Sequence, residues 1–126
     1  QGMTMLHSGF RATTLFVAGL MGLTGVVSAA AASHGDDPRL LAGISAMCLA
    51  HAPALVALYA AWPHFRTAAV AALLIAAGTA LFSADLAMRH VAGHGLFPMS
   101  APLGGTTIMA GWLAVSLGAF LPKKTA

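Results

Sequence analysis

The sequence has very few charged residues, and this shortage decides the class of protein. Only six basic and three acidic side chains occur among 126 residues, whereas 59% of the residues are hydrophobic. A chain of this composition cannot cover a water-facing surface with polar groups. The net charge of +3 comes from scattered basic residues that form no basic stripe, so we expect no nucleic-acid binding.

Cysteine is nearly absent as well. Cys48 is the only one, so no disulfide forms within the chain, and the redox compartment stays undetermined. The sequence also lacks a nucleophile elbow, a phosphate-binding glycine loop, paired carboxylates and a cofactor fingerprint. We therefore expect no enzyme activity and no cofactor.

The chain does have four long apolar runs. A helix needs about 20 apolar residues to cross the ~30 Å hydrocarbon layer of a bilayer, and each run is close to that length. The runs are continuous rather than alternating, which favours helices over a membrane β-barrel. The predicted spans are residues 13–33, 40–61, 66–88 and 103–121.

These spans predict an all-α fold, an integral membrane four-helix transmembrane bundle in one domain, residues 3–126. The first two connections are short, so we expect antiparallel up-and-down neighbours. Asp37 and Pro38 predict an N-cap and first helical residue, and Trp62-Pro63 predicts a helix end. Residues 1–2 resemble the remnant of a cleaved tag and carry no fold argument.

The basic residues favour one orientation in the membrane. Lys and Arg are enriched in cytoplasmic loops, and the side that carries more of them marks the cytoplasm. Both termini are predicted to be cytoplasmic on this count. One side has Arg11, Arg66, Lys123 and Lys124, and the other has Arg39 and Arg89.

Glycines recur at helical spacing in the first and fourth spans, and they predict close helix packing. Two interpretations stay open: packing inside the bundle, or the seam of a homodimer. The residues are Gly19, Gly22 and Gly25 in the first span and Gly104, Gly111 and Gly118 in the fourth.

His51 is the polar side chain nearest the middle of a span. Pro53, two residues later, deprives the carbonyl of Leu49 of its usual helical donor, so a polar pocket around His51 is one interpretation. In the other, His51 only bonds a neighbouring group and holds two helices together.

Asp85 is the one acidic residue within a span. Arg89 follows at i+4, on the same helix face, and favours a salt bridge. The functional alternative is a proton or cation site, because ionisable residues in membranes often mark pathways.

A metal site is a weaker hypothesis. Met47, Cys48 and His51 are soft or imidazole ligands on one helix, which suit copper(I) or zinc. His90 and His94 chelate a metal only if their segment is helical, and Gly93 and Gly95 argue against a stable helix there.

Several short motifs resemble those of the YgdD/YwdK-like family of small bacterial membrane proteins, which has relatives in animal mitochondria. In chain order they are Ser33-His34-Gly35, His51-Ala52, Gly78-Thr79-Ala80-Leu81-Phe82-Ser83, Pro102-Leu103-Gly104-Gly105 and Gly111-Trp112-Leu113. The resemblance covers nearly the whole chain after Arg11. It implies a four-helix fold in a bacterial inner membrane and supplies no activity, ligand or catalytic residue. His34, His51 and Ser83 are the polar positions that it maps.

The leading hypothesis is a non-catalytic packing, assembly or lipid-interacting component with a polar pocket around His51. Its partners would be the lipid bilayer and a homo-oligomer or larger membrane complex. One alternative is a small oligomeric channel or transporter in which His34, His51 and Asp85 line a route. The other is a metal- or haem-binding module that uses His51 with Met47, Cys48 or His34.

Overall fold

The structure, a computed structural model, describes residues 2–124, with side chains from residue 8 onward. Within that range the chain is helical, and its only β-type pairing is an isolated bridge between Phe65 and Pro122. The elements are α1 (Gly2–Ala32), α2 (Arg39–Ala61), a short 3-10 helix η1 (Trp62–His64), α3 (Ala68–Ala92) and α4 (Ser100–Gly118). Gln1 lies outside the described residues.

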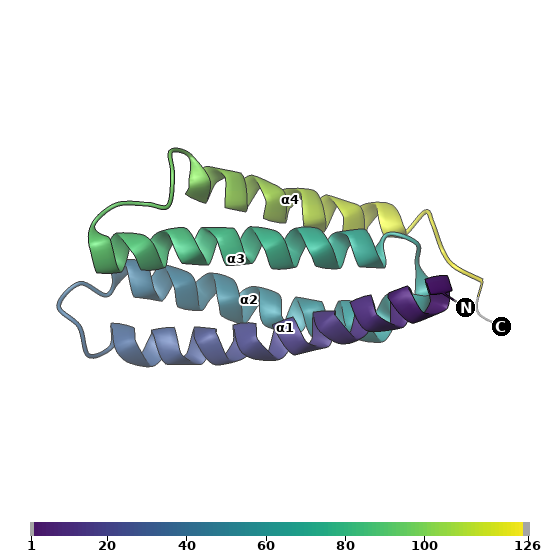
Figure 1. The fold of residues 1–126 in the computed structure, drawn as a ribbon, viewed down its shortest axis with the longest axis horizontal. Helices are drawn as coiled ribbons and strands as arrows, with labels where there is room; N and C mark the ends of the chain where they lie inside the picture. The colour runs from purple at the N-terminus through teal and green to yellow at the C-terminus, as the bar shows by residue number, and fades with distance from the viewer. Residues whose placement is uncertain (1, 125–126) are drawn as a thin grey trace.

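The helices lie side by side in chain order (Figure 1). α2 and α3 occupy the middle, while α1 and α4 form opposite edges. The core between them consists largely of small side chains, such as Ala18, Ala52, Ala71 and Ala72, together with Ile75. Each edge helix therefore has one packed face and a broad outer face.

Contacts at the helix ends place distant segments together. The Arg11 Nε donates to the carbonyl oxygen of Tyr59 at 2.8 Å, so the first half of α1 lies beside the end of α2. The backbone N–H of Arg66 donates to Leu121 at 2.8 Å, which joins the start of α3 to the end of α4. These contacts gather at one end of the molecule (Figure 1).

The helix limits differ from the predicted spans by one to four residues in α2, α3 and α4, and by more at the start of α1. α1 begins at Gly2 rather than near residue 13, because hydropathy marks a lipid-length segment and not the helix end. α2 begins at Arg39, with Pro38 rather than Asp37 as N-cap. The Asp37 carboxylate still accepts the N–H of Arg39 at 3.2 Å, so it caps the helix from one residue further out. The predicted helix end at Trp62-Pro63 is confirmed.

Three helices are long and apolar enough to cross a membrane: α1 from Ser8, α2 continued through η1 to His64, and α3. The fourth predicted span does not reach that standard in the described part of the chain. α4 has 19 residues, but Pro102, two adjacent glycines and two threonines dilute its apolar composition. Length and composition alone therefore support three of the four predicted spans.

Candidate functional site

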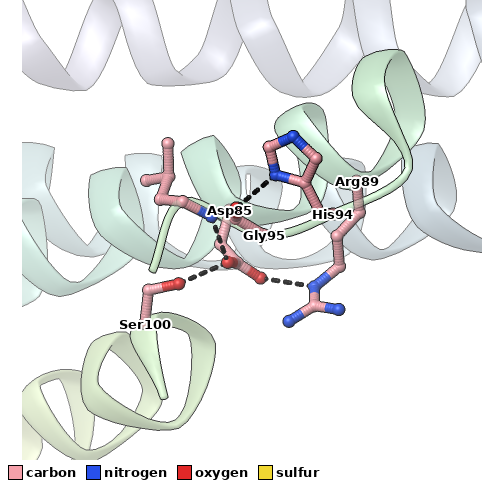
Figure 2. A network of polar contacts seen from close by, with 6 residues as sticks. Asp85, Arg89, His94, Gly95 and Ser100 are labelled. Atoms are coloured by element: carbon pink, nitrogen blue, oxygen red, sulfur yellow. Dashed lines mark hydrogen bonds and ion pairs between the residues drawn. The ribbon is translucent and has the colours of Figure 1, made fainter. Parts of the chain in front are cut away.

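Asp85 lies in the last third of α3, and its side chain has no exposed area. Its Oδ2 accepts a hydrogen bond from Nε of Arg89 at 2.8 Å, the pair expected from the i, i+4 spacing. Its Oδ1 accepts the backbone N–H of Leu96 at 3.0 Å and the hydroxyl of Ser100. Figure 2 shows these donors on both sides of the carboxylate. Asp85 thus joins α3, the α3–α4 connection and the first turn of α4.

The connection reaches the carboxylate because two residues adopt left-handed backbone conformations. Gly93 ends α3 with φ 82°, and its N–H donates to Arg89 at 3.0 Å, so the chain turns back. Met99 precedes α4 with φ 70°, a conformation that costs a non-glycine residue some free energy.

Gly95 lies directly over the carboxylate. A β-carbon at this position would overlap Oδ1 of Asp85 and would lie 2.9 Å from Nη2 of Arg89. The carbonyl of Gly95 also faces Nδ1 of His94 at 2.9 Å (Figure 2). The α3–α4 connection can lie this close to Asp85 and Arg89 because Gly95 has no side chain.

The hydrogen bonds of this network hold α3, the α3–α4 connection and α4 together rather than form a reactive centre. An ionised carboxylate only accepts hydrogen bonds, and each of its partners here is a donor. Asp85 is enclosed by the connection and by Arg89, whose side chain is 45% exposed. A ligand would have to displace the connection before it could reach the carboxylate.

His51 is buried in α2 and has a partner on each ring nitrogen. Nδ1 lies 2.8 Å from the carbonyl oxygen of Met47, and Nε1 of Trp112 donates to Nε2 at 3.0 Å. Because an indole N–H only donates, Nε2 must accept, and the proton is assigned to Nδ1. The rings are tilted at a centroid distance of 5.8 Å. His51 therefore links α2 to α4, and Trp112 covers it.

The metal candidates do not converge on one point. The Sγ of Cys48 lies 3.4 Å from the hydroxyl oxygen of Ser83 on α3, and Met47 meets His51 through its carbonyl. Within residues 8–124, no group of three or more His, Cys, Asp or Glu side chains could hold a metal ion. His34 is exposed in the connection between α1 and α2, at one end of the molecule (Figure 1).

Cys48 and Ser83 do line a cavity of about 260 Å³ where α1, α2 and α3 meet. Most of its lining is apolar, and half of the lining residues come from α1, including Val17, Leu20 and Met21. Thr79 also contributes, and its buried hydroxyl has no hydrogen-bond partner within the described structure.

Gly104 and Gly111 of α4 pack against α3. A β-carbon on Gly104 would lie 2.8 Å from the backbone nitrogen of Phe82, and one on Gly111 would lie 2.6 Å from Ile75 Cγ1. Gly118 meets the ring of Phe65 in the same way. At Gly104 and Gly111 this face is packed against α3, which agrees with the interpretation of packing inside the bundle.

The glycines of α1 are less uniform. Gly25 packs on Leu49, where a β-carbon would lie 2.7 Å from Cδ2, and Gly22 faces Ala52 at 3.7 Å. Gly19 has open space around the place of its missing side chain. Of these three glycines, only Gly22 and Gly25 therefore lie against another helix of the chain.

The sequence did not predict that Gly95, Leu96 and Ser100 lie against Asp85. Helical spacing could not relate them to Asp85, because the segment from Asp85 to Ser100 is not one continuous helix and contains two left-handed residues. A glycine-rich segment between an acidic residue and a serine was the available signal. The contact between Trp112 and His51 was not predicted either, since no local sequence signal relates residues on α2 and α4.

The fold and these contacts define a helical protein in which three helices are suited to crossing a membrane. Residues 28–105, more than half of the chain, match the family described as protein of unknown function (DUF423), and the chain belongs to this family. The match includes His34, His51 and Asp85 but ends before Trp112, so it is narrower than the resemblance in the motifs. No solved structure matches the chain significantly.

Proposed function

We propose that this protein is a non-catalytic, four-span membrane component that packs against lipid and partner proteins. The proposal includes antiparallel helices, a place in the bacterial inner membrane and cytoplasmic termini. It also includes the narrower YgdD/YwdK-like grouping within the family. The motifs, the distribution of basic residues and the contacts at the helix ends support these finer parts of the proposal.

One observation carries the proposal: the buried ionisable side chains Asp85, His51 and Cys48 have their hydrogen-bond partners within the chain. Asp85 has three donors, His51 has a partner on each nitrogen, and Cys48 meets Ser83. Groups that handle a substrate or a proton need at least one free, accessible position. These groups instead connect helices, which is a structural role.

The outer faces support contact with lipid or protein. On α1, Phe16 is 68% exposed and Leu23 is 62% exposed. On α4, Met109 and Leu113 are similarly exposed. Large apolar side chains are rarely exposed in such numbers on a water-soluble monomer.

α4 is proposed as the fourth span despite its modest apolarity. Its 19 residues extend about 28 Å, close to the ~30 Å of the hydrocarbon layer. The residues that lower its apolarity include Gly104 and Gly111, which face α3. Lipid would meet Met109 and Leu113 on the opposite face.

The two alternatives gain no support from the geometry. A transporter needs a polar route, whereas Asp85 is closed off by its connection and His51 by Trp112. A metal or haem site needs a free imidazole nitrogen, and both nitrogens of His51 are engaged.

The test combines insertion, flux and association. The chain is expected to resist alkaline carbonate extraction and to leave proton and cation flux in proteoliposomes at the level of empty vesicles. A photoreactive residue in place of Leu23 should form one discrete protein adduct in native membranes, whereas the same residue in place of Asp36 should not. Flux above background that is lost in His51→Ala would overturn the proposal in favour of transport.

A further inference from the structure

Charge is separated between the two ends of the molecule. The chain has only three acidic side chains, Asp36, Asp37 and Asp85, and they lie in the α1–α2 connection and near the end of α3. The opposite end holds the start of α1, the α2–α3 connection and the segment after α4 (Figure 1). Four of the six basic residues lie there, and no Asp or Glu joins them: Arg11, Arg66, Lys123 and Lys124.

Backbone contacts hold part of this basic group together. The N–H of Arg66 donates to Leu121 at 2.8 Å, and the N–H of Lys123 donates to His64 at 3.0 Å. Phe65 and Pro122 form an isolated bridge between these two bonds. The segment after α4 is therefore paired to the α2–α3 connection, which brings Arg66 beside the lysines.

The basic side chains border an open cavity of about 380 Å³ that is also partly apolar. Arg66 and Lys124 are exposed, and Phe120 is 82% exposed. Arg11 is engaged elsewhere, because its guanidinium carbon lies 4.7 Å from the centre of the Tyr59 ring. The lining residues are Arg66, Phe120, Leu121, Pro122, Lys123 and Lys124.

We propose that this cavity binds the headgroup of an anionic phospholipid. A phosphate offers the negative charge and acceptor oxygens that Arg66, Lys123 and Lys124 can satisfy. Phe120 and Leu121 supply the apolar surface that the first part of the acyl chains needs. Basic side chains at a membrane surface attract anionic lipids in this way. The inference rests on the proposed membrane insertion and adds the ligand class.

The test measures lipid retention by the full chain in detergent, using native mass spectrometry with equal amounts of phosphatidylglycerol and phosphatidylcholine. Phosphatidylglycerol should be retained preferentially. Arg66→Gln should lower its retention about fivefold, which corresponds to about 1 kcal/mol for one basic residue near the surface. Arg39→Gln, which removes one exposed charge at the opposite end, should leave retention unchanged.

Three outcomes would overturn the inference. They are equal retention of the two lipids, an equal loss in Arg39→Gln and Arg66→Gln, or full displacement by millimolar inorganic phosphate. The last would indicate a general anion site rather than a lipid site. If the chain resists carbonate extraction but shows no lipid preference, this inference fails and membrane insertion stands. If the chain is extracted, the proposed function itself fails.

Discussion

At the scale of single residues, the buried side chains of Asp85 and His51 bind other parts of the chain. The carboxylate of Asp85 holds the α3–α4 connection, and the imidazole of His51 accepts the indole N–H of Trp112. In an apolar environment such groups cost free energy unless they are paired. Because their partners lie on other elements, these groups are paired only when the helices adopt one particular arrangement.

Asp85→Ala should destabilise the fold by about 2–4 kcal/mol, because it leaves the N–H of Leu96 and the hydroxyl of Ser100 without an acceptor. Reversible unfolding of the full chain in mixed detergent–SDS micelles measures this loss. Asp36→Ala removes an exposed carboxylate and should change stability by less than about 0.5 kcal/mol. Equal unfolding midpoints for the two variants would show that the Asp85 network contributes nothing.

At the scale of helices, close approach of α3 and α4 depends on glycine at particular positions. Gly78 and Gly104 face each other, and a β-carbon on Gly78 would lie 2.7 Å from the carbonyl oxygen of Gly104. The atoms concerned are helix backbone, which cannot move aside as a flexible side chain can. The neighbouring Gly105 has open space instead.

Alanine substitutions at two adjacent glycines are therefore expected to change the stability of the protein in opposite directions. Gly104→Ala should destabilise the protein by about 1–3 kcal/mol, because its new methyl group forces α4 away from Phe82 on α3. Gly105→Ala should stabilise it by up to about 1 kcal/mol, since alanine favours the helix and meets no neighbour. The unfolding measurement in mixed micelles compares them directly. A loss of stability in both variants, or in neither, would contradict the packing of α4 on α3.

At the scale of the whole molecule, the two ends differ in the charged side chains that they carry. One end carries the α1–α2 and α3–α4 connections with the acidic residues, and the other carries the basic group (Figure 1). If the molecule crosses a bilayer with these ends in water, residues from different connections on one end must face the same side.

Cysteine accessibility tests this arrangement in a Cys48→Ala background. Asp36→Cys and Phe97→Cys should react with a membrane-impermeant maleimide from one side of sealed vesicles. His64→Cys and Lys124→Cys should react only from the opposite side, because η1 and the segment after α4 lie at the other end. Labelling of Asp36→Cys and Lys124→Cys from the same side would contradict the four-span arrangement.

Much of the fold could be predicted from the sequence, because hydropathy and helix signals are local. The apolar runs predicted four helices, Trp62-Pro63 marked a helix end, and the i, i+4 spacing identified the Asp85–Arg89 pair. α1 extends further toward the N-terminus than the predicted span, since helical backbone continues past the lipid-length segment when no breaker intervenes.

The contacts between helices could not be predicted in this way. Three features depend on how the helices pack. They are the face of α4 that meets α3, the contact of Ser100 with Asp85, and the hydrogen bond from Trp112 to His51. Composition and local spacing determine which segments are helical and apolar, because those properties depend on neighbours in the chain. Only the tertiary structure decides which polar groups pair, because the partners lie on separate helices and meet only after the backbones have packed.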